Sequence, residues 1–211
     1  YECTAGQTIK DTNDTVVLSA TNATITGCII DDSLEITSKV IQYSLDESNI
    51  YFTNDVKIND NINNLEISTN EINYNLERQN IESLGNSQIK DDLGNIYRVN
   101  QFEYNIKKKV IKLSSLEVLD VSGNEFKIEM AFLDLEKKEL VAKDVGLNFK
   151  ISDKSENEPR LKGRSLISNE ENTIVEKGTF TFCKKRKNCP PWEMSAEEIK
   201  HDKKKKTIYY K

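Results

Sequence analysis

The chain has 211 residues, of which 36% are hydrophobic and 31% are charged, and its net charge at pH 7 is −5. This composition is typical of a soluble protein with one elongated domain or one to two compact domains. The longest apolar runs span only a few residues, whereas a transmembrane helix needs roughly 20, so we expect no membrane-spanning helix. The negative net charge gives no reason to expect a nucleic-acid partner.

The first 33 residues differ in character from the rest. They are rich in Thr, Ala and Asn around the segments 16–18 and 23–26. The opening Tyr1-Glu2-Cys3 shows neither a basic nor an apolar signal region, so we expect a mature chain or an excised fragment. We predict that residues 1–33 form a divergent N-terminal segment or cap. The alternative is that they form the first coil of the repeat that follows.

A short pattern recurs between Leu34 and Phe149. Apolar and polar residues alternate strictly in its first three copies, which predicts half-buried β-strands with Tyr43, Tyr74 and Tyr104 on the apolar face. The four copies follow one another at offsets of 31, 30 and 29 residues and are Ile41-Gln42-Tyr43-Ser44-Leu45, Ile72-Asn73-Tyr74-Asn75-Leu76, Phe102-Glu103-Tyr104-Asn105-Ile106 and Ala131-Phe132-Leu133-Asp134-Leu135.

Two kinds of turn separate the predicted strands. Short connections, polar except for Val110, occupy residues 46–49, 77–80, 107–110 and 136–139. The second kind, at 59–64, 90–95 and 120–124, is rich in the Asn, Asp and Gly that supply turn dihedrals. Each repeat is therefore predicted to consist of two strands and two corners, and stacked repeats would bury a continuous apolar face. That face must be covered by another sheet, by a partner or by lipid.

Two further stretches are predicted to lack long strands. Residues 152–162 are polar and contain Pro159, which predicts an exposed loop crossing between sheets. Residues 203–206 are four consecutive lysines, which predict a solvated turn between two short strands.

No catalytic or metal-binding pattern is visible. The only histidine, His201, has no candidate nucleophile beside it, and its distance of twelve residues from Cys189 is unlike the spacing of zinc ligands. Glu193, Glu197 and Glu198 show no pairing across a cleft, and neither a phosphate-binding loop nor a nucleophile elbow occurs. We therefore predict that the protein is not an enzyme and uses no metal or cofactor.

The end of the chain carries a group of motifs. In order and spacing they resemble the N-terminal periplasmic domain of the LptD family, also called the OstA-like or organic solvent tolerance family, and most closely its alphaproteobacterial members. The motifs are Phe180-Thr181-Phe182-Cys183, a second cysteine at Cys189, Pro190-Pro191-Trp192-Glu193-Met194-Ser195-Ala196, Ile199-Lys200-His201-Asp202 and Thr207-Ile208-Tyr209-Tyr210, with the segment 157–165 upstream.

This resemblance implies an all-β fold, an open β-jellyroll or β-taco of stacked antiparallel strand repeats covering residues 34–211, with the barrel domain absent. It implies a periplasmic domain of an outer-membrane protein in Gram-negative cells, which receives lipopolysaccharide and passes it along an apolar groove toward the barrel. The implied partners are lipopolysaccharide, an LptA-like bridge protein joined by β-edge pairing, and an LptE-like lipoprotein reached through the absent barrel.

Two hypotheses remain for the apolar face. Its side chains either stack as an ordinary core or, as the resemblance implies, line a groove that takes acyl chains. The candidate groove residues are Ile41, Tyr43, Ile72, Tyr74, Leu76, Phe102, Tyr104, Ile106, Leu133 and Leu135. Alternative functions are a soluble bridge subunit similar to LptA or LptC, and a structural or adhesin-like β-solenoid with a dry interior.

The four cysteines fall into two pairs by position, Cys3 with Cys28 and Cys183 with Cys189. In a chain that resembles a periplasmic protein, an even number favours disulfides, and a Cys183–Cys189 bridge would close a short loop. In the family, a cysteine resembling Cys183 bonds instead to the C-terminal barrel, so the pairing stays open. The basic run 184–187 between them is either a solvated loop or a contact for lipid phosphates.

Overall fold

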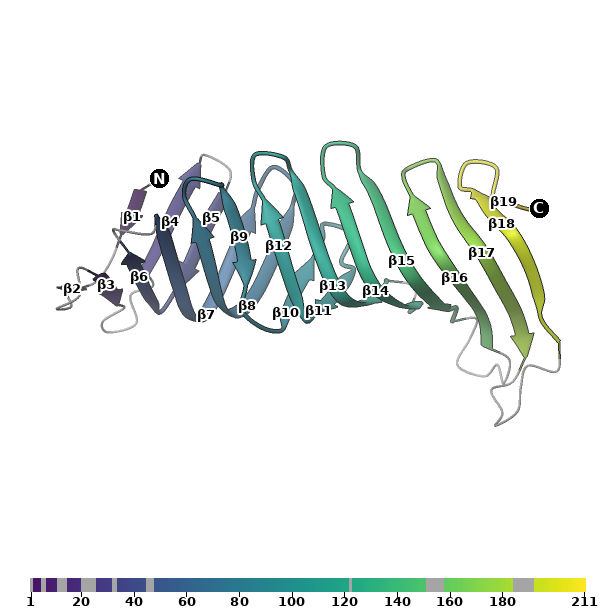
Figure 1. Ribbon diagram of the computed structural model, residues 1–211, viewed down its shortest axis with the longest axis horizontal. Helices are drawn as coiled ribbons and strands as arrows, with labels where there is room; N and C mark the ends of the chain where they lie inside the picture. Colours follow the sequence, from purple (N-terminus) through teal and green to yellow (C-terminus); the bar gives the residue numbers. More distant parts are fainter. Residues whose placement is uncertain are drawn as a thin grey trace. The chain divides into compact units, whose positions relative to one another are not determined.

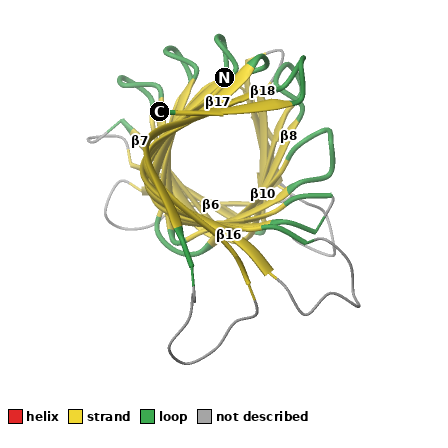
Figure 2. Ribbon diagram, turned by 90° about the vertical axis from the view of Figure 1, so that its right-hand side faces the viewer, coloured by secondary structure: helices red, strands yellow, loops and turns green. Residues whose placement is uncertain are grey.

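The computed structural model describes residues 2–4, 7–10, 15–19, 26–31, 34–44, 48–121, 123–150, 158–183 and 192–211. Within these ranges every regular element is a β-strand and no helix occurs (Figures 1 and 2). Neighbouring strands pair antiparallel, as a jellyroll of stacked strand repeats requires. The predicted all-β class is confirmed.

The chain divides into two compact units, residues 1–110 and 111–211. The strands of the first unit are β1 (Glu2–Thr4), β2 (Gln7–Lys10), β3 (Thr15–Ser19), β4 (Thr26–Asp31), β5 (Leu34–Ser38), β6 (Val40–Ser44), β7 (Asn49–Asp60), β8 (Leu65–Asn75), β9 (Asn80–Ser83), β10 (Ser87–Lys90), β11 (Ile96–Val99) and β12 (Gln101–Asn105). The boundary falls at the first residue of β13 (Val110–Leu119), and β14 (Glu125–Asp134), β15 (Glu139–Asn148), β16 (Glu158–Ser168), β17 (Asn172–Cys183), β18 (Met194–Asp202) and β19 (Thr207–Tyr210) follow.

The first unit consists of two arms that share the long strands β7 and β8. In arm A, β3, β6, the first half of β7, the second half of β8, β9 and β12 pair in that order. In arm B, β4, β5, the second half of β7, the first half of β8, β10 and β11 pair in that order. The strands β3 and β4, which lie within residues 1–33, thus add to the two arms, while the predicted domain division at residue 33 stays a prediction.

A β-bulge in β7 separates the two arms. Asn54 and Asp55 both have positive φ angles, of 64° and 55°, and the register with β8 shifts between Thr53 and Val56. A bulge bends its strand and increases the local twist. The bulge therefore allows one pair of long strands to serve both arms.

The short turns have one design in both units. The last residue of the preceding strand is Asn or Asp, and its side-chain oxygen accepts a hydrogen bond from the backbone N–H three residues later. The residue that follows this N–H donor adopts a positive φ of 50–53°. The four anchors are Asn75, Asn105, Asp134 and Asp202, and the residues with positive φ are Gln79, Lys109, Lys138 and Lys206. The predicted turn at 203–206 is confirmed, whereas the turns at 76–79, 106–109 and 135–138 each begin one residue earlier than predicted.

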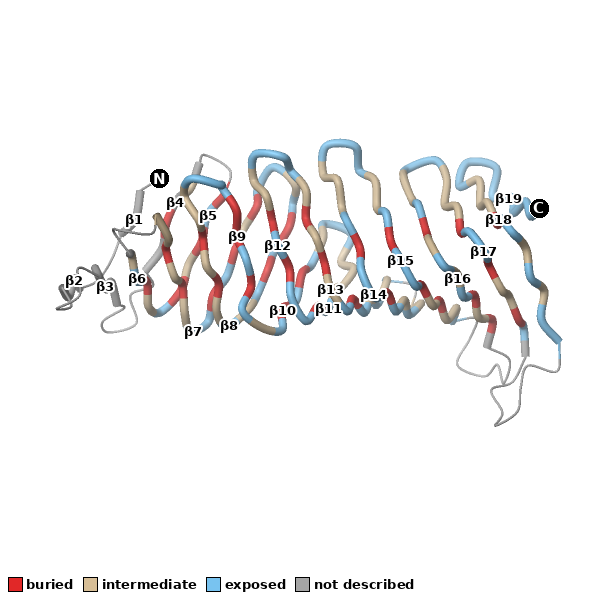
Figure 3. Tube along the Cα trace, viewed as in Figure 1, coloured by how far each residue is buried: buried red, intermediate tan, exposed pale blue. Residues whose placement is uncertain are grey.

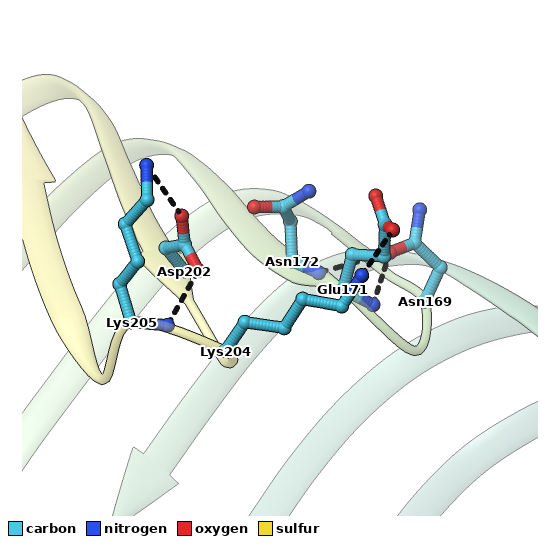
Figure 4. A network of polar contacts seen from close by, with 6 residues as sticks. All are labelled: Asn169, Glu171, Asn172, Asp202, Lys204 and Lys205. Carbon is cyan, nitrogen blue, oxygen red and sulfur yellow. Dashed lines mark hydrogen bonds and ion pairs between the residues drawn. The ribbon is translucent and has the colours of Figure 1, made fainter.

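In the second unit, a polar network joins the β18–β19 turn to the turn between β16 and β17 (Figure 4). Asp202 accepts the backbone N–H of Lys205 at 2.9 Å, and Asn169 accepts the backbone N–H of Asn172 at 2.9 Å. The ammonium group of Lys204 lies 2.9 Å from the Glu171 carboxylate and so connects the β18–β19 turn to the β16–β17 turn. Because this ion pair is exposed, it orders the turns more than it stabilises the fold.

The second kind of corner is also a repeated side-chain motif. In each corner, one Asp carboxylate accepts both the backbone N–H and the side-chain amide of an Asn three or four residues later, at 2.7–2.9 Å. The pairs are Asp60 with Asn63, Asp91 with Asn95, and Asp120 with Asn124. The predicted corner positions are therefore confirmed, and the aspartate is the residue that closes each of them.

In the second unit, alternate strands change their burial phase halfway along (Figure 3). In β15, Ala142 and Val145 are both buried although they are three residues apart, and Asp144 between them has a φ of 52°. Ser115 in β13 and Lys177 in β17 hold the same place and also have positive φ angles. A residue with a positive φ shifts the alternation of buried and exposed side chains by one position, so the apolar side chains stay on the same face of the sheet where the strand bends.

One predicted loop is partly wrong. Residues 152–162 were expected to form an exposed crossing, but β16 begins at Glu158, and Pro159 and Leu161 are buried. The segment was predicted as a loop because its sequence is mostly polar, but its polar residues, such as Arg160 and Lys162, are those on the side of the strand that faces away from the buried side. Residues 151–157 lie outside the described residues.

Two glycines allow close packing in the second unit. A Cβ atom added to Gly163 would overlap Val175 Cγ1 and would lie 3.2 Å from Val145 Cγ2. A Cβ atom added to Gly178 would lie 2.5 Å from Ile199 Cδ1. By contrast, the nearest atom to an added Cβ at Gly146 is 3.9 Å away, which is ordinary contact. The sheet can therefore accept a side chain at Gly146 but not at Gly163.

We predict that Gly163→Ala lowers the free energy of unfolding by about 1–3 kcal/mol, because its methyl group overpacks the buried face. Gly146→Ala, the matched control, should change it by less than about 0.5 kcal/mol, as is usual for surface substitutions. Urea denaturation followed by circular dichroism measures both values. Equal effects from the two substitutions would contradict the packing assigned to Gly163.

The turn aspartates predict a pH dependence. Hydrogen bonds from the backbone N–H groups of Lys137 and Lys205 hold the pKa values of Asp134 and Asp202 below their ordinary value of 3.8. Because the folded pKa lies below the unfolded one, this stabilisation is present above the unfolded pKa and is lost as the pH falls through the folded pKa. A double Asp134→Asn, Asp202→Asn variant keeps both acceptors but not the charge, so its stability should fall less steeply than that of the wild type between about pH 4.5 and pH 2.5. Parallel stability curves from urea titrations across this range would exclude the effect.

Candidate functional site

Arm A of the first unit carries two rows of mostly buried side chains that cross β6, β7, β8, β9 and β12. Tyrosine and isoleucine alternate along the first row, in the order Tyr43, Ile50, Tyr74, Ile81 and Tyr104. The second row contains Ile41, Phe52, Ile72 and Ser83, with Phe102 held beside Ser83 by a 2.8 Å hydrogen bond from its backbone N–H to Ser83 Oγ. Directly opposed side chains on neighbouring strands lie about 5 Å apart, so each row is continuously packed.

Arm B buries a matching row. Its members, in strand order, are Cys28, Ile36, Ile58, Ile67, Ile89 and Tyr97. The four isoleucines are at most 4% exposed. Burial in an apolar environment and a hydrogen bond to Asp91 raise the pKa of Tyr97, so its hydroxyl stays protonated and donates to that carboxylate at 2.7 Å. The apolar side of arm B is therefore closed at its β11 end by a tyrosine, as arm A is at β12.

One buried hydrogen bond joins the two arms directly. The hydroxyl of Tyr104, from β12 in arm A, donates to Asp60 Oδ2 at 2.6 Å, and Asp60 ends β7 in arm B. Both residues are nearly inaccessible, with exposures of 2% and 3%. The carboxylate also accepts two hydrogen bonds from Asn63. We call the Tyr104–Asp60 contact the clasp, because it holds the buried faces of the arms together.

The predicted groove residues take three kinds of place. Ile41, Ile72, Tyr74, Phe102 and Tyr104 are at most 3% exposed and lie together in the two rows of arm A. Tyr43 belongs to the first row but is half-buried. The remaining four are half-buried: Leu76, Ile106 and Leu135 lie in the short turns, and Leu133 lies in β14 opposite Leu140.

In this conformation the interior of the first unit is therefore filled by its own side chains. This packing agrees with the first of the two hypotheses for the apolar face, in which its side chains stack as an ordinary core. Lipid contact by these residues stays a prediction, and it would require the arms to separate.

The predicted groove lacked the arm B row and, in arm A, Ile50, Phe52 and Ile81. It also lacked Asp60. A carboxylate in an Asn-rich corner was interpreted only as a turn residue. The available signal was its place at the end of an alternating strand, where it continues the buried phase of Val56 and Ile58. A charged residue in a buried phase needs a partner, and here the partners are Tyr104 and Asn63.

The cysteines are only partly described. Cys28 is fully buried in the arm B row and forms a disulfide, and Cys3 is the residue opposite it in the pairing of β1 with β4. Cys183 is the last residue of β17, whereas Cys189 and the basic run 184–187 lie outside the described residues. The Cys183–Cys189 bridge therefore stays a prediction.

The described part of the tail motifs lies in and beside β17, β18 and β19, while Pro190 and Pro191 lie outside the described residues. Trp192 lies with its ring 6.3 Å from that of Phe180, and its carbonyl oxygen accepts a 2.8 Å hydrogen bond from Thr181 Oγ1. The ring is 49% exposed, so it covers one side of Phe180 rather than filling a core. His201 is half-buried in β18 between Thr173 and Ile208.

Among the described residues, no group of three or more His, Cys, Asp or Glu side chains could hold a metal ion. No helix in this part of the chain is long and apolar enough to cross a membrane.

Comparison with known protein families relates the first unit to lipopolysaccharide assembly. Residues 31–116 match the family described as lipopolysaccharide-assembly, LptC-related. The match covers less than half of the 211 residues. It includes β5 to β12, which contain the two rows of arm A and all of the arm B row except Cys28. A search of curated proteins found no match. The similarity supports the predicted relation to lipopolysaccharide-transport proteins, whose role is transport rather than catalysis, but it does not support the specific assignment to LptD.

Proposed function

We propose that the chain is a lipopolysaccharide-binding component of a periplasmic transport bridge, similar in role to LptC or LptA. The observation that carries the proposal is that the LptC-related match covers the same strands that form the facing apolar rows of the first unit. The tail motifs behind the LptD prediction lie beyond residue 116, outside that match. For this reason the bridge-type alternative now has better support than the outer-membrane placement.

Acyl chains would bind by entering between the arms. Each buried CH₂ group is worth about 0.8 kcal/mol, so lipid chains with many such groups can replace contacts between side chains at little net cost. Ile72, Phe102 and the alternating Tyr–Ile row would then contact lipid instead of arm B. The proposed step is a passive exchange of one apolar contact for another, with lipopolysaccharide as the cargo.

Relay to a neighbouring protein would use the sheet edges. An unpaired strand edge presents N–H and C=O groups to an added strand, so a bridge protein similar to LptA could extend the sheet. The proposed location is the periplasm, in association with the lipopolysaccharide-transport machinery.

A dry structural solenoid is the second candidate, and the near-complete burial of the arm A rows favours it. The two functions differ in whether lipid enters the interior. Adjacent residues on opposite faces of one strand provide the test, because Tyr104 is buried and Glu103 is exposed.

We predict that a photo-crosslinking amino acid at Tyr43 or Tyr104 forms adducts with lipopolysaccharide, whereas the same label at Glu103 does not. Tyr43 is half-buried and should accept the label without loss of folding, so it covers the case in which labelling at Tyr104 disrupts the core. Gel-shift detection with an antibody to lipopolysaccharide measures the adducts. Adducts at Glu103 alone, or at none of the three positions in folded protein, would favour the dry solenoid.

The clasp predicts a second result. Tyr104→Phe removes one hydrogen bond from a buried carboxylate and should lower the free energy of unfolding by about 1–3 kcal/mol. It should also raise the yield of lipid adducts at Tyr43, since the arms separate more readily. Tyr97→Phe is the matched control, because its hydroxyl also donates to an aspartate but within arm B. An equal rise of adducts in both variants would show that the clasp does not control access.

A further inference from the structure

The second unit has a hollow over Gly146 on the exposed face of its sheet. Its volume is about 460 Å³, and it lies over β15, β16 and the neighbouring end of β14. Gly146 lies between Lys127 and Lys162 in the strand register. Because residues two apart share a face, Asn148 and Arg160 form the next row on this side.

The hollow exists because Gly146 has no side chain. Its lysine neighbours are on the flanking strands, and their Cα atoms are separated by two strand spacings, or roughly 10 Å. Both lysines are exposed, and nothing on Gly146 stands between them. Their flexible stems can therefore bring the two ammonium groups over the glycine from opposite sides.

Three cationic side chains line this hollow. Lys127, Arg160 and Lys162 line it together with Asp144, whose carboxylate lies 3.5 Å from Lys143. Glu125 is opposite Asn148 in the neighbouring row. Lys162 makes no ion pair with any residue that the structure describes, whereas Lys127 forms an exposed pair with Glu117 and is also attracted by Glu125. Such exposed pairs are weak and exchange readily for another anion.

We propose that this hollow binds a phosphate or diphosphate group, carried either by an amphiphile or free in solution. Ammonium and guanidinium groups form charge-assisted hydrogen bonds with phosphate oxygens, and the guanidinium can bind two oxygens at once. The volume admits a diphosphate with its ester carbon. The inference deepens the proposed function and rests on it only for the lipid source, since it gives the phosphorylated headgroup a site of its own in the second unit.

The test uses the full chain, with calorimetric titration of inorganic pyrophosphate and, separately, of phosphatidylglycerol vesicles compared with phosphatidylcholine vesicles. Gly146→Glu places a carboxylate in the hollow, and Lys162→Gln removes a cation. Each should weaken binding about tenfold, the effect of losing one charge-assisted hydrogen bond. Gly146→Gln, which fills the hollow without charge, should weaken it as well. Lys107→Gln, in an exposed turn of the first unit, should leave it unchanged.

Binding of pyrophosphate that depends on Gly146 and Lys162 supports a phosphate site that free phosphate can fill. Binding of phosphatidylglycerol vesicles alone, with the same dependence, supports a site for lipid headgroups. No binding of either probe, or binding that Gly146→Glu and Lys162→Gln leave unchanged, overturns the proposal. The lipid adducts at Tyr43 are measured independently, so failure of the phosphate site and failure of the transport function are distinguishable.

Discussion

The constraint on which the first unit depends is that neither arm can leave its apolar face in water. Fully burying one Ile, Phe or Tyr-sized side chain is worth about 1.5–3 kcal/mol, and each arm carries a whole row of them. The arms satisfy this constraint by covering each other. A single pair of bent strands, β7 and β8, makes this possible, because each belongs to both arms.

In the second unit, the residues with positive φ within the strands also keep apolar side chains out of water. Side chains alternate along a strand, so a bend would turn the apolar side outward unless the alternation shifted with it. Asp144 and Lys177 make that shift by adopting positive φ angles. In each strand the residue two positions before and the residue directly after are both buried. The cost of about 1 kcal/mol for a left-handed residue is small beside the burial that it preserves.

The sequence predicts the strands of the first unit well because their pattern is local. Strict alternation around Tyr74 and Tyr104 identifies both the strand and its buried side, and the Asn- and Asp-rich corners appear where expected. The bulges could not be predicted, since Ser115, Asp144 and Lys177 have nothing in common that marks a left-handed conformation. β16 was partly missed because only its buried face is apolar, and Asp60 was missed because its partner, Tyr104, is 44 residues away. Those errors share one cause, which is that the deciding contact is not between neighbours in the sequence.

The interior of the first unit is tightly packed and consists mainly of apolar side chains. The clasp is a buried side-chain hydrogen bond between the arms, whereas the contacts between apolar rows are non-directional and could equally be made with an acyl chain. An interior whose contacts are mainly apolar is therefore suited to exchanging those contacts for acyl chains, because the exchange leaves few polar groups without a partner.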